Sequence, residues 1–108
     1  MLFMVIEHFK NADAAPVGER FRQHGRMMPQ GVEYRASWVD PAAGRCFQIM
    51  ESPDRHLLDQ WIAHWDDLVD FEIIPVVPSA DFWSARDAVT KVAENFSGSD
   101  HAAPENAN

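Results

Sequence analysis

The opening segment Leu2–Phe9 constrains the fold most, because it has the composition of a strand and is apolar on both alternating faces. Phe3 and Val5 lie on one face, and Met4 and Ile6 lie on the other. Burying a large apolar side chain contributes roughly 1.5–3 kcal/mol, so both faces need cover. A chain of 108 residues supports one domain. A single small domain must therefore cover both faces of this strand or find a partner that does.

The rest of the chain alternates between strand and helix patterns. We expect a helix from an Asp13 cap to a stop at Gly25, strands at Val32–Val39 and Arg45–Glu51, a helix that begins at Ser52-Pro53-Asp54, a strand at Val69–Val77, and a last helix over 79–96. Alternation in the second strand places Tyr34, Ala36 and Trp38 on one face. Pro75 has no N–H to donate, so its strand is expected at a sheet edge.

The element order is β-α-β-β-α-β followed by a helix, which predicts an α+β, ferredoxin-like antiparallel sheet with both helices on one face. We expect this domain over residues 1–78, a C-terminal helical extension over 79–96 and a disordered tail over 97–108. Two helices cover one face only. A second copy of the chain is the simplest cover for the other, which predicts a homodimeric α/β barrel. The extension folding back onto the sheet is the alternative.

Composition restricts the partners of this chain. Seventeen acidic residues against nine Lys and Arg give a net charge of −8, which disfavours nucleic acid and anionic membranes as partners. No run approaches the roughly 18 apolar residues of a membrane span. The single Cys46 cannot form an intrachain disulfide, and the opening residues lack a secretory-signal pattern. We therefore expect a cytoplasmic protein.

The predicted topology gathers several polar and aromatic residues at one end of the sheet, where the first strand ends and the third and fourth begin. We expect a ligand pocket there that contains Trp38, Gln48, Trp65 and Asp70. Trp65 also fits the apolar stripe of a helix, so packing in the core is its plain alternative.

His8 and Glu72 are the catalytic candidates of this pocket, with His8 as general base and Glu72 or Asp70 orienting it. The alternatives are a histidine bonded to backbone or water, and a solvated or interface carboxylate. No metal site is expected, because His56 and His64 are eight residues apart and do not have the spacing of a helical ligand pair. No phosphate-binding loop is present, and no motif identifies a cofactor.

Four segments resemble the short bacterial domain-of-unknown-function 3303 family over about residues 1–80: MLFMVIEHF, RASWVD, CFQIMES and W-x3-W-x2-L-x2-FEIIPVVPS. The resemblance implies a place near the dimeric α/β-barrel superfamily, which includes muconolactone isomerases, cofactor-free monooxygenases and haem-binding relatives. It carries no catalytic residues over to this chain.

These observations predict a homodimer that binds a small, partly apolar molecule, with isomerase-like or monooxygenase-like chemistry on an activated aromatic or enol as one possibility. The first alternative is a non-catalytic binding or assembly module whose interior is packed and holds no ligand. The second is a haem-binding protein with a histidine as axial ligand.

Overall fold

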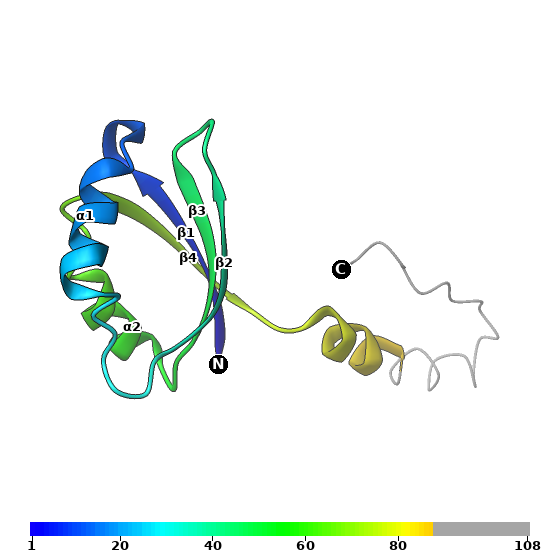
Figure 1. Ribbon diagram of the computed structural model, residues 1–108. Coiled ribbons are helices and arrows are strands. Elements are labelled where there is room, and N and C mark those ends of the chain that lie inside the picture. The colour runs from blue at the N-terminus through cyan, green and yellow to red at the C-terminus, as the bar shows by residue number, and fades with distance from the viewer. Residues whose placement is uncertain (88–108) are drawn as a thin grey trace, which may run out of the picture. The chain divides into compact units, whose positions relative to one another are not determined.

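The computed structural model of this protein describes residues 1–87, which fall into two units that divide after Val76. The first unit contains strands β1 (Leu2–Phe9), β2 (Glu33–Asp40), β3 (Arg45–Glu51) and β4 (Val69–Val76), helices α1 (Ala15–His24) and α2 (Arg55–Ile62), and the short 3-10 helix η1 (Lys10–Ala12) (Figure 1). In the second unit residues 79–87 are helical. The remainder of the helix predicted over 79–96, and the tail predicted over 97–108, lie outside the described residues.

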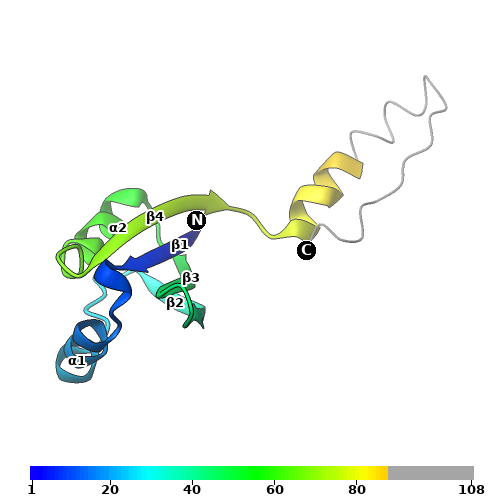
Figure 2. The same ribbon diagram turned by 90° about the horizontal axis from the view of Figure 1, so that it is seen from above.

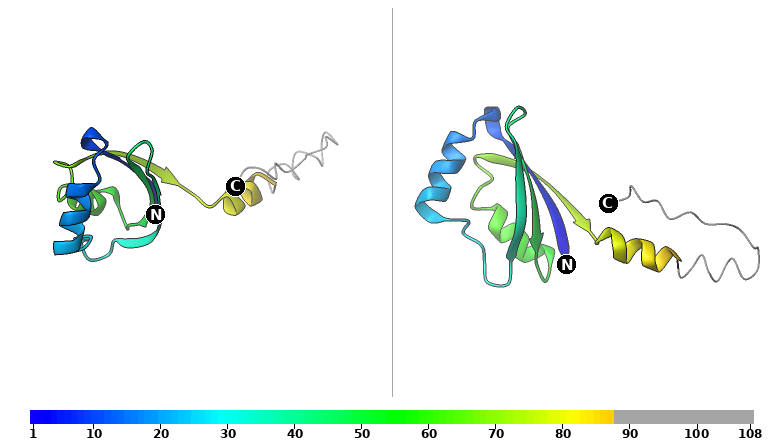
Figure 3. Two further views of the ribbon diagram at one scale, coloured as in Figure 1. Left: turned by 45° about the horizontal axis from the view of Figure 1, so that its top comes forward. Right: turned by 45° about the vertical axis from the view of Figure 1, so that its right-hand side comes forward.

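The four strands form one sheet in the order β2-β3-β1-β4, and every neighbouring pair is antiparallel. Helices α1 and α2 lie on the same side of this sheet (Figures 1 and 3). The ferredoxin-like α+β fold is thereby confirmed. Strand β4 is an edge strand, as expected from Pro75, since an edge position tolerates the missing N–H.

The core lies between the sheet and the helices. Phe3 and Val5 of β1 are 1% and 0% exposed, and they pack with Leu58 and Trp61 of α2. The Trp61 ring also meets Phe71 of β4 edge to face, with 5.6 Å between ring centroids. The apolar stripe of α2 therefore joins β1 and β4 in one core.

The caps of both main helices differ from the predicted residues. For α1 the cap is Ala14, without a side-chain cap bond, so the predicted Asp13 cap is wrong. Asp13 lies one position earlier, and its Oδ1 accepts a hydrogen bond from Ala15 N at 3.0 Å. For α2 the cap is Asp54, whose Oδ1 accepts from Leu57 N at 2.9 Å. The Ser52 hydroxyl instead donates to the Asp54 carbonyl, which corrects the assignment of Ser52 as the cap.

A β-bulge in β2 changes the faces predicted for that strand. Tyr34 pairs with Met50 and Ala36 with Ile49, so Arg35 is an extra residue without its own partner. The predicted alternation is wrong beyond this point. Tyr34 lies on the side of the helices, whereas Ala36 and Trp38 lie on the opposite side.

The side of the sheet that faces away from α1 and α2 carries two neighbouring rows of apolar side chains, which we call the open face. One row contains Trp38, Phe47 and Ile6, and the next contains Ala36, Ile49, Met4 and Ile74, as the strand register requires. Trp38 is 61% and Ile74 is 39% exposed. Within the first unit no helix covers this face. The sheet itself is curved along its width (Figure 2).

No helix among residues 1–87 is both long enough and apolar enough to cross a membrane.

Candidate functional site

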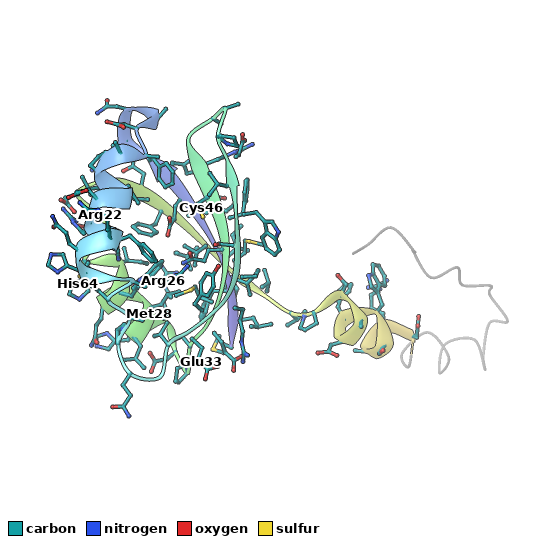
Figure 4. All side chains as sticks on the ribbon, in the orientation of Figure 1. Arg22, Arg26, Met28, Glu33, Cys46 and His64 are labelled. Carbon is teal, nitrogen blue, oxygen red and sulfur yellow. The ribbon has the colours of Figure 1, made fainter. Side chains whose placement is uncertain are left out.

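A cavity of about 320 Å³ lies between the sheet and the two helices. Most of its walls are apolar or aromatic, and its polar groups come from the strands and from the loop after α1. The lining residues are Glu7, Phe9, Ala14, Val17, Gly18, Phe21, Arg26, Ser37, Val39, Cys46, Gln48, Trp61 and Trp65. Arg26 occupies the space between α1 and the strands, and Cys46 lies on the strand side of that space (Figure 4).

Helix α1 contributes one continuous wall of this cavity. Ala14, Val17, Gly18 and Phe21 follow the i, i+3, i+4, i+7 spacing that places residues on one helix face. Gly18 has no side chain there, and a Cβ built on it would meet no heavy atom within 4 Å. The small volume of Gly18 thus leaves space that a larger residue would occupy.

The six residues predicted to form one pocket are divided between the two faces of the sheet. Gln48 and Trp65 line the cavity. His8, Trp38, Asp70 and Glu72 lie on the open face, because each is in register with other residues of that face. The expected single pocket is therefore corrected. Neighbouring residues of a strand point to opposite sides of the sheet, so residues near one sheet end need not share a pocket.

His8 and Glu72 do come together, on the open face. His8 Nε2 is 3.8 Å from Glu72 Oε1, and both side chains are about half exposed. Asp70 does not join this pair; its Oδ1 lies 3.9 Å from the Nζ of Lys10. The catalytic roles of His8 and Glu72 stay predictions. The sheet separates the pair from the cavity, so neither is within hydrogen-bond reach of a molecule bound there.

The acidic group of the cavity is Glu7, which is not among the residues predicted for the site, although its neighbour His8 is. Burial raises the pKa of the Glu7 carboxyl to about 7, and the nearby positive charge of Arg26 acts in the opposite direction. A signal for Glu7 was present: it continues the series Phe3, Val5 on the core face of β1, where a charged residue is unexpected. At neutral pH this carboxyl exchanges a proton readily.

Cys46 is the cross-strand partner of Glu7 and also lines the cavity. Burial, and secondarily the negative charge of Glu7, raise the pKa of its thiol to about 11, while a hydrogen bond with Ser37 and the charge of Arg26 oppose the shift. A thiol with this pKa remains protonated at neutral pH. Cys46 is therefore a weak hydrogen-bond donor in the wall and a poor nucleophile.

Arg26 is held at the cavity by two tryptophans. The indole nitrogens of Trp61 and Trp65 both donate to the Arg26 carbonyl, at 2.9 and 3.0 Å. Trp65 therefore has two functions: its ring lines the cavity, and its N–H anchors the loop between α1 and β2. Trp65 was predicted to lie in the pocket, but its bond to the Arg26 carbonyl was not.

The lining residues do not fit a haem with a histidine as axial ligand. None of the four histidines within residues 1–87 lines the cavity, and the protonated Cys46 thiol is not a ready substitute. The same part of the chain contains no cluster of three or more potential metal-binding side chains.

Comparison with known proteins identifies a family for most of the chain. The family model described as a domain of unknown function (DUF3303) matches residues 1–97. Comparisons with curated proteins and with solved structures find no significant match.

Proposed function

Since the chain belongs to the DUF3303 family of domains of unknown function, we propose from the geometry of the cavity that the protein binds a small, partly apolar molecule between α1, α2 and the sheet. The observation that carries this proposal is the cavity itself. Its volume of about 320 Å³ is at the lower end of the ~300–1,000 Å³ common for ligand pockets. A molecule of one or two rings suits this size.

The distribution of groups along the walls supports a ligand with one polar end. Phe9, Val17, Trp61 and Trp65 offer apolar and aromatic contacts, whereas Glu7, Arg26, Cys46 and Gln48 place polar groups together. Few, convergent polar groups on an apolar background are the usual composition of such sites.

A module with a filled interior is the competing function. It predicts that the tryptophans pack on one another. Trp61 packs edge to face against Phe71, and Trp61 and Trp65 lie in one buried cluster with both indole N–H groups on the Arg26 carbonyl, so the tryptophans alone fit either function. The volume of about 320 Å³ that these residues line is what favours ligand binding over a packed interior.

The proposal is tested by filling the cavity. Gly18→Leu adds a side chain on the lining face of α1, where a Cβ meets nothing. The change also replaces a residue of poor helix propensity, so the variant should fold. We expect saturation-transfer NMR to detect binding of phenol, indole or phenylacetate to the wild type, and at least a tenfold weaker affinity in Gly18→Leu.

Gln23→Leu is the matched control, because Gln23 lies five residues further along α1 on the opposite helix face and is exposed. This variant should bind the probes as the wild type does. The proposal is overturned if no probe binds the wild type, or if Gly18→Leu binds them with unchanged affinity.

We further propose that the open face is covered by a second copy of the chain, as a homodimer. Four strands of seven or eight residues present a face on the order of 19 by 26 Å, or about 500 Å² before side-chain relief. That supplies most of the ~800 Å² per partner found in stable complexes. The apolar rows centred on Ile6 and Met4 are of the kind that homodimer interfaces bury.

Light scattering on the full chain at micromolar concentration tests the dimer. We expect the mass of two chains for the wild type and of one chain for Trp38→Glu, which introduces a charge at the most exposed tryptophan of the open face. Phe82→Glu, in the helical residues 79–87, should leave the dimer intact. A monomeric wild type would refute the proposal that a second copy covers the open face. So would a dimer that persists in Trp38→Glu and is lost in Phe82→Glu.

A further inference from the structure

Arg26 lies in an unusual stretch of backbone between α1 and β2. Gly25 and Met27, on either side of it, have φ angles of 67° and 58°. This left-handed region is ordinary for glycine but costly for methionine, and such strain persists only where the surrounding structure enforces it. The two indole bonds to the Arg26 carbonyl supply that enforcement. The fold therefore holds Arg26 in a defined position at some cost.

The guanidinium group of Arg26 is held by stacking rather than by charge. Its central carbon lies 3.6 Å from the ring centroid of Tyr34 and 5.1 Å from that of Phe21. Within the described residues Arg26 has no carboxylate partner. The other five arginines of the first unit, Arg20, Arg22, Arg35, Arg45 and Arg55, each form an ion pair with a carboxylate.

Glu7, the acidic residue of the cavity, does not form an ion pair with Arg26. Glu7 is close enough for the two charges to interact, yet the two side chains form no direct ion pair, and the Glu7 carboxyl has no hydrogen-bond partner among residues 1–87. The site thus holds a guanidinium with free donors and a carboxyl with free oxygens near one another in the wall of a largely apolar space.

We propose that Arg26 and Glu7 together bind the carboxylate of a small organic acid whose aromatic or branched body fills the cavity. Arg26 supplies the charge and the N–H donors that match a carboxylate. Glu7, in its protonated form, donates its O–H to the same group. This inference rests on the proposed function and adds the chemical class of the ligand.

The proton on Glu7 makes such binding dependent on pH. The titratable or charged groups that face Glu7 are Arg26 from the loop and the Cys46 thiol from β3, whereas α1, α2 and β4 present apolar or aromatic side chains to it. Loss of the Glu7 proton places a negative charge beside the ligand carboxylate. Affinity for an acid should therefore fall as the pH rises from 6 to 8.

Matched pairs of acids and amides test this assignment: benzoate with benzamide, phenylacetate with phenylacetamide, and indole-3-acetate with indole-3-acetamide. In calorimetric titrations at pH 6 we expect the best acid to bind at least tenfold more tightly than its amide. Arg26→Gln should abolish that preference. Arg22→Gln, on the exposed surface of α1, is the control and should retain it.

Glu7→Gln provides a second readout, since an amide cannot lose a proton in this range. Its affinity for the acid should be the same at pH 6 and pH 8, while that of the wild type falls at least threefold. Amides that bind as tightly as acids, with no effect of Arg26→Gln, would overturn the carboxylate assignment and leave the small-molecule function intact. Absence of binding by every member of the pairs would overturn both.

Discussion

Glu7 of β1 and Cys46 of β3 are direct partners across the sheet, and both side chains enter the same cavity. Burial raises the pKa of Glu7 to about 7 and that of Cys46 to about 11. The charge of Glu7 contributes to the shift at Cys46, so the two groups are linked electrostatically. The pair therefore makes both the stability of the protein and the ionisation of the Cys46 thiol dependent on the state of Glu7.

Replacing Glu7 by Gln should alter how stability depends on pH. The carboxyl ionises near 4.5 when unperturbed and near 7 in the folded protein. The folded state thus binds the extra proton between these values, and stability falls as the pH rises through this window. In urea denaturation, the free energy of unfolding of Glu7→Gln relative to that of the wild type should rise by roughly 2–3 kcal/mol between pH 5 and pH 8.

Glu19→Gln is the control for this effect, because Glu19 is an exposed carboxyl that pairs with Arg22 on α1. The difference in unfolding free energy between Glu19→Gln and the wild type should change little between pH 5 and pH 8. If the unfolding free energies of Glu7→Gln and the wild type changed in parallel with pH, the raised pKa of the half-buried Glu7 carboxyl would be contradicted.

Cys46 should react slowly with alkylating reagents in the folded protein. With a pKa of about 11, the thiolate is scarce at pH 8. An unperturbed cysteine, with a pKa near 8.5, is about one-quarter ionised there. We expect iodoacetamide, followed by mass spectrometry, to modify native Cys46 on the order of 100-fold more slowly than the chain in guanidinium chloride. Glu7→Gln should raise the native rate, because it removes the charge that opposes the thiolate; equal native and unfolded rates would be inconsistent with this account.

Gly44→Ala should destabilise the hairpin between β2 and β3. Gly44 has φ +66°, and a Cβ there would lie 2.8 Å from the Ala12 Cα. The backbone conformation alone disfavours an L residue by about 1–2 kcal/mol, and the backbone contact adds to this cost. We expect a loss of about 2 kcal/mol or more in thermal or urea unfolding.

Gly18→Ala is the matched comparison, since its Cβ enters open space in the middle of α1. It should stabilise the protein by up to about 1 kcal/mol. Equal effects of the two substitutions would show that neither the contact with Ala12 nor the φ angle at Gly44 matters.

Asp54→Ala should remove the N-cap of α2. The Leu57 N–H then loses its acceptor, which costs about 0.5–2 kcal/mol in unfolding free energy. Asp54→Asn keeps an oxygen acceptor and should lower the unfolding free energy by only about a few tenths of a kcal/mol. If Asp54→Ala were as stable as the wild type, Asp54 would not act as the cap.

Much of the fold could be predicted because its signals are local. The bounds of β1 and β3, the stop of α1 at Gly25 and the edge position of β4 follow from alternation, glycine and proline chemistry. The bulge at Arg35 was missed, because nothing in the strand pattern marks the extra residue. That one residue placed Tyr34 and Trp38 on different faces.

The candidate site was predicted only in part. Gln48 and Trp65 were identified and do line the cavity. His8 is the residue that the sequence favours, because histidine titrates near neutral pH by itself. Burial brings the pKa of Glu7 into the same range, and that burial depends on the folded structure.

The amino-acid sequence is enough to predict the order of the elements, the antiparallel sheet and more apolar strand surface than two helices cover. These properties depend on patterns that repeat over a few neighbouring residues. The packing of the folded chain is needed to place Glu7, Arg26 and Cys46 in one cavity, with His8 and Glu72 outside it. The reason is physical: a strand, a loop and a second strand meet there through packing against Trp61 and Trp65, and the desolvation that shifts a pKa exists only once they have met.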